Sequence, residues 1–115
     1  MNNPILLNEI LDRVAGNREF VLQMLGLFFQ SSDTRLANLR RESAACNYPE
    51  LAEQAHKLEG LASNLSIHKA LLILRNLHSE AVKANKPEID LLLSDLEEAI
   101  GEAKAFFQND PLFKP

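Results

Sequence analysis

Three histidines are the side chains of this chain best suited to chemistry at neutral pH: His56, His68 and His78. The segment around His56 has the apolar spacing of a helix. At 100° per residue, its apolar residues fall about 100° to 180° away from His56. They are Leu51, Ala55, Leu58, Ala62 and Leu65. His56 is therefore predicted to face solvent.

The predicted face around His56 carries only small side chains at one and two turns: Ala52, Gly60 and Ser63. A glycine in a helix interior costs about 1 kcal/mol relative to alanine, so a close approach by another molecule would explain Gly60. An exposed imidazole in such a strip suits a nucleophile that attacks a phosphoryl group presented by a partner. The alternative is an ordinary solvated histidine beside a tolerated glycine.

The other candidates carry weaker arguments. The run from Glu53 to His56 is a single Glu-x-x-His, whereas a di-iron bundle needs two copies and two further glutamates, so no metal site is expected. His68 is expected to be a surface residue and His78 to pack at the edge of the fold. Cys46, the only cysteine, is expected to be a partly buried, unreactive thiol.

The elements that position these residues are predicted to be helices, because leucine is abundant and proline and glycine occur between blocks of helical length. Asn17 and Ser66 are expected to be N-caps. The long helix after Asn17 is expected to bury five residues: Phe20, Met24, Phe28, Leu36 and Leu39. The predicted helices span residues 7–14, 17–44, 49–64, 67–84 and 88–108.

Short connections between long helices favour one all-α domain, an antiparallel up-and-down four-helix bundle with a short extra N-terminal helix. A net charge of -4 makes nucleic acid an unlikely partner. No apolar run approaches the ~20 residues of a membrane span, and no signal peptide is evident. We therefore expect a cytoplasmic protein. No phosphate-binding loop or kinase motif is present, so phosphoryl groups would have to come from another protein.

Residues 55–65, Ala-His-Lys-Leu-Glu-Gly-Leu-Ala-Ser-Asn-Leu, resemble the signature helix of histidine-containing phosphotransfer (HPt) domains. In that family a short first helix precedes a long helix with a Phe near its middle, here Leu27-Phe28-Phe29, and then the histidine helix and two more helices. The resemblance implies that His56 is the phosphoacceptor and that Gly60 gives clearance for a docking receiver domain.

The sequence departs from the family at Glu59, where a lysine is usual three residues after the histidine. Its carboxylate would lie beside a phosphoryl group of about -1.5 to -2 charges and disfavour it, by less than ~1 kcal/mol if exposed. Lys57 and Arg75 are the basic residues that could compensate. The predicted phosphate environment is therefore Lys57, Glu59, Gly60, Ser63 and Arg75.

The resemblance implies a phosphocarrier in a two-component phosphorelay, rather than a free-standing kinase, with no cofactor of its own. The expected partners are receiver domains of response regulators or of a hybrid sensor histidine kinase. Their aspartates give and take the phosphoryl group, and their own Mg²⁺ supports the transfer. The alternative is an interaction module, either a degenerate HPt-like domain or an unrelated four-helix scaffold, that docks signalling partners without transfer.

Overall fold

A computed structural model describes residues 3–114. Within them the chain is all-α, as predicted, with five α-helices, one short 3-10 helix and no strand. The elements are α1 (Leu7–Arg13), α2 (Arg18–Ala44), α3 (Tyr48–Asn64), α4 (His68–Val82), α5 (Lys86–Asn109) and η1 (Pro111–Phe113).

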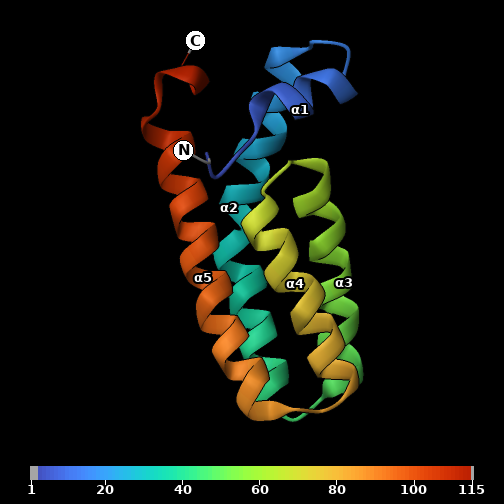
Figure 1. Cartoon of the computed structure of the whole chain (residues 1–115). Helices are drawn as coiled ribbons and strands as arrows, with labels where there is room; N and C mark the ends of the chain where they lie inside the picture. Colours follow the sequence, from blue (N-terminus) through green and yellow to red (C-terminus); the bar gives the residue numbers. More distant parts are fainter. Residues whose placement is uncertain (1–2, 115) are drawn as a thin grey trace.

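The four long helices lie side by side in an elongated body of 43 × 25 × 24 Å, and α1 lies across one end (Figure 1). Each long helix packs against two others: α3 against α2 and α4, and α5 against α4 and α2. The pair α3 and α4 makes the most extensive contact. Residues on the facing sides of α3 and α4 are therefore held most firmly relative to each other.

Three of the connections between helices have the same backbone form. At the end of α3, the amide of Ile67 donates to the carbonyl of Ala62 and the amide of Ser66 donates to that of Ser63. This is the Schellman ending, which places one residue in the left-handed region. Ser66 (φ 51°) takes that position after α3. Cys46 (φ 53°) takes it after α2, and Ala84 (φ 56°) takes it after α4.

Two expected features of the helices are corrected. Ser66 is not the N-cap of α4, because it is the buried, left-handed residue that ends α3, and Ile67 takes the N-cap position. In α2, Asn17 does cap the helix, but Phe20 is 44% exposed and Val21 is buried instead. The first half of α2 has apolar pairs such as Phe20-Val21, so spacing alone did not identify the buried member.

One continuous apolar core runs between the helices and includes the whole predicted inner face of α3. The short helix α1 is attached to this body through Arg13, whose guanidinium donates to the carbonyls of Ser63 and Asn64 at 3.2 and 2.6 Å. A cation at the C-terminal end of α3 also complements the helix dipole. The end of the histidine helix is thereby held in place by α1.

Candidate functional site

His56 is exposed near the middle of α3, as the helical spacing predicts. Leu51, Ala55, Leu58 and Ala62 fix the rotation of the helix, because all four are buried on the opposite side. Pro49 lies in the first turn, where its missing amide costs no hydrogen bond. The imidazole is therefore presented to solvent by a rigid element.

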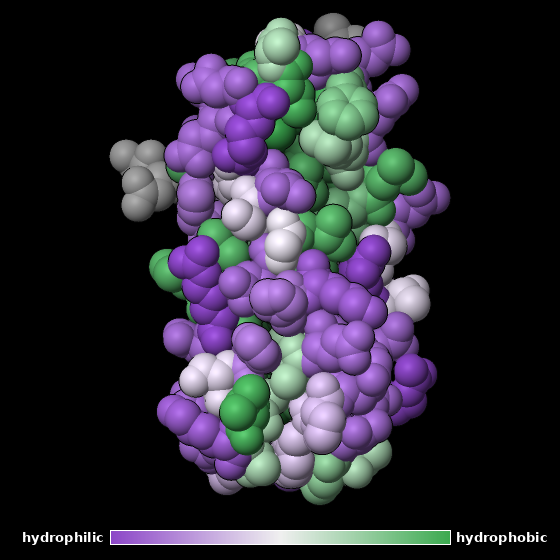
Figure 2. Space-filling model, turned by 90° about the vertical axis from the view of Figure 1, so that its right-hand side faces the viewer, coloured by the Kyte–Doolittle hydropathy of each residue, from purple (hydrophilic) through white to green (hydrophobic). Residues whose placement is uncertain are grey.

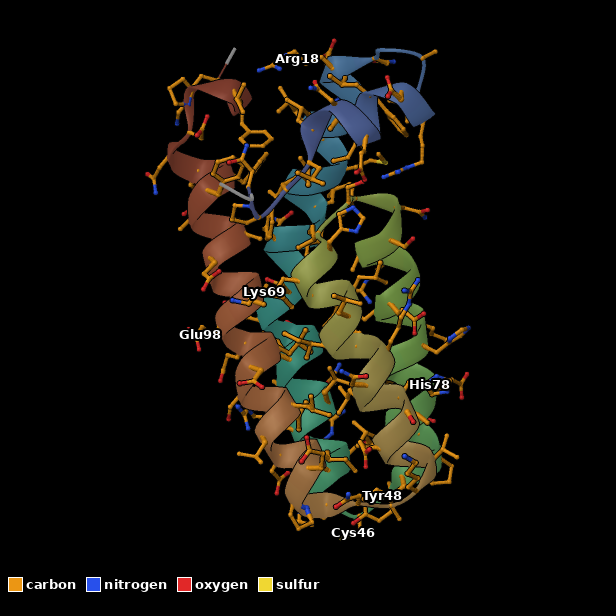
Figure 3. All side chains as sticks on the ribbon, viewed as in Figure 1. Arg18, Cys46, Tyr48, Lys69, His78 and Glu98 are labelled. Carbon is orange, nitrogen blue, oxygen red and sulfur yellow. The ribbon has the colours of Figure 1, made fainter. Side chains whose placement is uncertain are left out.

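His78 of α4 lies beside His56, with the ring centroids 5.3 Å apart and the ring planes at 44°. It is half-buried, at the boundary between α3 and α4 (Figure 3). This neighbour was missed by the sequence reasoning, which placed His78 only at an edge of the fold. A signal did exist: Ile67 at the turn lies midway in sequence between His56 and His78, so a tight antiparallel pair brings the two to the same height.

Glu59 and Arg75 occupy the next position along the same pair of helices, again with Ile67 midway between them. Arg75 Nε lies 3.4 Å from Glu59 Oε2. The Glu59 side chain is 20% exposed and that of Arg75 is 56% exposed. The structure thus pairs the acidic residue that departs from the family pattern with one of the two basic residues expected to compensate for it.

Lys57 lies toward the other side of α3. Its Nζ is 3.4 Å from Glu53 Oε1, one turn earlier on the helix, and it lines a hollow of about 230 Å³ between α2 and α3. The structure therefore separates Lys57 from the group formed by His56, Glu59, His78 and Arg75. It also pairs Glu53, the acidic member of the Glu-x-x-His pattern, with a lysine.

Gly60 and Ser63 are exposed on α3, as expected, but Ala52 is buried. Ala52 belongs to the buried core of the helices, so the small exposed residues beside His56 are Gly60 and Ser63. A Cβ added at Gly60 would meet no atom within 4 Å. Packing within the chain therefore does not require a glycine at position 60.

The flank of α3 that faces α2 has an apolar hollow of about 250 Å³, between α2 and the C-terminal half of α3. Met24, Leu27 and Leu61 are among its lining residues, and Leu27 is 67% exposed. Figure 2 shows the face of the molecule on the α3 side, with most of its apolar side chains in the upper half and mainly hydrophilic ones, with a few apolar side chains among them, in the lower half. Apolar and hydrophilic surfaces thus meet along α3.

The remaining candidates lie away from this group. His68 Nε2 is 2.7 Å from Glu9 Oε1, and this hydrogen bond lowers the pKa of Glu9 below its usual value. Cys46 is exposed, which corrects the expectation of partial burial, because its left-handed turn carries the side chain outward at the far end of the molecule (Figure 3). Neither residue takes part in the site.

Three side chains of the site place possible metal ligands close together. A ring nitrogen of His56, a carboxylate oxygen of Glu59 and a ring nitrogen of His78 all lie within 4.8 Å of one another. The sequence predicted no metal site, because the only pattern considered there was Glu53 with His56. In the structure the acidic residue near His56 is Glu59, three residues after the histidine instead of three before it. The third possible ligand, His78, comes from α4.

Across residues 3–114, no helix combines the length and the apolar character needed to cross a bilayer.

Comparisons with known proteins add one finding to this geometry. Neither the curated proteins nor the solved structures contain a match to the chain. The family profile of the Hpt domain matches residues 23–105, which include all of α3 and α4 and most of α2 and α5.

Proposed function

Because the chain belongs to the Hpt domain family, whose members carry phosphoryl groups in two-component relays, we propose that His56 accepts a phosphoryl group from a receiver-domain aspartate and passes it to another receiver aspartate. The receivers belong to response regulators or to a hybrid sensor histidine kinase. A relay of this kind operates in the cytoplasm.

The observation that carries this proposal is the exposed imidazole of His56 beside an open helix surface at Gly60. For transfer, a receiver must bring its phosphoaspartate within bonding distance of a ring nitrogen, and its surface must then cover α3 around Gly60. A glycine that internal packing does not require fits that close approach. The apolar hollow bordered by Leu27 and Leu61 offers further docking area.

The chemistry needs only one nucleophilic nitrogen from this chain. The electron pair of the unprotonated ring nitrogen forms an N–P bond while the P–O bond to the aspartate breaks. The aspartate leaves as a carboxylate, and the imidazole keeps the proton on its other nitrogen. The receiver's Mg²⁺ supports the charge of the transferred group, and this chain is expected to need no cofactor of its own.

The fold proposed for this function is a single domain, an antiparallel up-and-down four-helix bundle capped by α1. In this arrangement α2 and α5 support the α3–α4 pair from behind, as their contacts with α3 and α4 indicate. Because α3 and α4 are packed along their length, docking would meet a preformed surface rather than a segment that orders on binding. The phosphate environment then comprises Glu59, Gly60, Ser63 and Arg75, with Lys57 on the other flank.

The competing function is an interaction module that docks receivers without transfer. The observation that favours it is Glu59, which places a carboxylate where the family usually has a lysine. Its pairing with Arg75 weakens this argument, because the two charges offset each other at the position where the phosphoryl group would sit.

The test is incubation of the protein with a panel of phosphorylated receivers, followed by measurement of acid-labile, base-stable label. We expect the parent to be labelled and His56→Gln to lose the label with an unchanged circular dichroism spectrum. His78→Gln and His68→Gln are matched controls that should keep it. Label that follows His78 instead would refute the choice of His56, and receiver binding without any label would favour the interaction module.

A further inference from the structure

We propose that His56, Glu59 and His78 form a binding site for a divalent transition-metal ion, represented by Zn²⁺, and that the bound ion blocks phosphoryl transfer at His56. The inhibitory part rests on the proposed function, whereas the metal site does not. Two imidazoles and one carboxylate are a common ligand set for this class of metal.

The positions of the three residues suit one ion. His56 and Glu59 are three residues apart on α3, so their side chains project from the same face, and His78 faces them from α4. Their ligand atoms lie within 4.8 Å of one another. In a tetrahedral zinc site with bonds of about 2.0–2.2 Å, ligand atoms lie about 3.4 Å apart. Modest rotation of exposed or half-buried side chains closes that difference.

The backbone already provides the organisation that such a site needs. The ligands come from two helices that make the most extensive contact in the molecule, joined by a turn with two specific backbone hydrogen bonds. No loop has to fold to bring the third ligand into place. Three protein ligands leave a coordination position open to water, as in exchangeable rather than closed structural zinc sites.

Arg75 is the residue that opposes metal binding. Its guanidinium contacts Glu59, so the carboxylate must leave an ion pair at 3.4 Å to reach a metal, and the positive charge repels a dication. Removing Arg75 should therefore tighten metal binding by a few-fold. A nonspecific surface histidine would not respond in this way.

The ion would act on the nucleophile directly. A metal bound at a ring nitrogen of His56 either occupies the electron pair needed for the N–P bond or, from the other nitrogen, withdraws electron density from it. It would also lie on the side of His56 where Glu59 and Arg75 are found, which is the predicted environment of the phosphoryl group. Zinc occupancy is thus expected to lower the rate of labelling of His56.

Calorimetric titration with Zn²⁺ and the visible spectrum of the Co²⁺ complex test the site without any receiver. We expect one ion per chain, bound at least ten-fold more weakly by His78→Gln and by Glu59→Gln, since even outer partners of a metal ligand change affinity by about 10–100-fold. His68→Gln is the matched control, because His68 faces Glu9 and, among residues 3–114, belongs to no group of three possible ligands. A parent that binds no ion, or an equal loss in His68→Gln, would overturn the site.

The blocking effect is tested by labelling with and without Zn²⁺ in the parent and in His78→Gln. We expect zinc to reduce labelling in the parent much more than in the variant. Equal inhibition would place the action of zinc on the receiver and overturn the blocking role. If no receiver labels the parent, the phosphotransfer proposal fails, and the calorimetric result still decides the metal site.

Discussion

The contact between Glu59 and Arg75 changes the charge that Glu59 is expected to contribute beside His56. On the sequence alone, Glu59 is an acidic group beside a predicted phosphohistidine. In the structure its carboxylate is paired with Arg75 at 3.4 Å, so the local charge is close to balanced before any phosphoryl group arrives. Arg75 is more exposed than Glu59 and is the more accessible of the two to a phosphate oxygen.

The balance of these charges predicts an order among variants in the steady-state level of phosphorylated His56. Arg75→Ala should give the lowest level, Arg75→Ala with Glu59→Gln a level near the parent, Glu59→Gln a higher one, and Glu59→Lys the highest. Neighbouring steps should be at most about five-fold, because exposed pairs contribute up to ~1 kcal/mol. The measurement is phosphohistidine per chain at low salt, and the differences should shrink as ionic strength rises.

The pair formed by Lys57 and Glu53 provides the control for that series. Lys57→Ala removes a cation from α3, the helix of His56, but from the side that faces α2, so its effect should be smaller than that of Arg75→Ala. Equal labelling of the parent and Arg75→Ala at low salt would show that the charge of Arg75 does not reach the phosphoryl group.

Single residues also show how much the sequence could predict. The exposure of His56 followed from helical spacing alone, because five apolar residues fixed the rotation of α3. The closeness of His78 did not follow, because it depends on the register between two helices. Cys46 was misplaced for a related reason: a left-handed turn residue points where its backbone directs it, and no periodicity describes that position.

At the scale of the element, α3 combines a buried stripe with two small exposed residues beside His56, namely Gly60 and Ser63. Gly60 lies within this helix at a cost of about 1 kcal/mol relative to alanine, although nothing inside the molecule fills the space beside it. Alanine at this position would stabilise the helix. Gly101 of α5 is equally open, so the approach of a partner at Gly60 has to be tested by comparing the two positions.

Gly60→Ala and Gly101→Ala form a matched pair for this comparison. Both glycines are exposed in helix interiors with no atom within 4 Å of an added Cβ, but Gly101 lies on α5. Each variant should raise the free energy of unfolding by about 0.5–1 kcal/mol in urea denaturation. Only Gly60→Ala should also slow phosphoryl transfer from a receiver. Equal transfer rates in the two variants would mean that no partner approaches α3 at Gly60.

At the scale of the whole molecule, the first and last long helices are joined by a polar contact at the end opposite α1. Ser43 Oγ of α2 donates to Asp90 Oδ1 of α5 at 2.8 Å, and Lys86 Nζ lies 3.4 Å from Asp90 Oδ2. The hydrogen bond from Ser43, followed by the charge of Lys86, lowers the pKa of Asp90 below its usual value of 3.8. The ionised carboxylate thus favours the closed arrangement of helices.

The lowered pKa of Asp90 predicts how stability depends on pH. The contribution of ionised Asp90 to the free energy of unfolding should be complete above about pH 4, the pKa of an aspartate in the unfolded chain. It should be lost as the pH falls through the lower pKa of the folded state. The Asp90 side chain is 49% exposed, so the contribution should stay below ~1 kcal/mol. Asp90→Asn should flatten the acid limb of a plot of unfolding free energy against pH.

Glu88→Gln is the charge-matched control for that measurement. Glu88 lies two residues before Asp90, in the first turn of α5, and within residues 3–114 its side chain has no hydrogen-bond or ion-pair partner. The control should keep an acid limb closer to that of the parent. An Asp90→Asn variant whose acid limb matches the parent's would show that the contact does not contribute to stability.

The Schellman endings that join the long helices have a consequence for how fast the chain folds. One residue in each connection belongs to both helices that it joins, because it completes the ending of the first helix and is the N-cap of the next. These residues are Asn47, Ile67 and Asn85. Each helical hairpin therefore closes over very few residues, and the entropy lost in closing it is small. Neighbouring helices can meet soon after they form, as in other helical domains of low contact order, which fold in microseconds to milliseconds. The pairing of His56 with His78 would then be established among the earliest tertiary contacts of the chain.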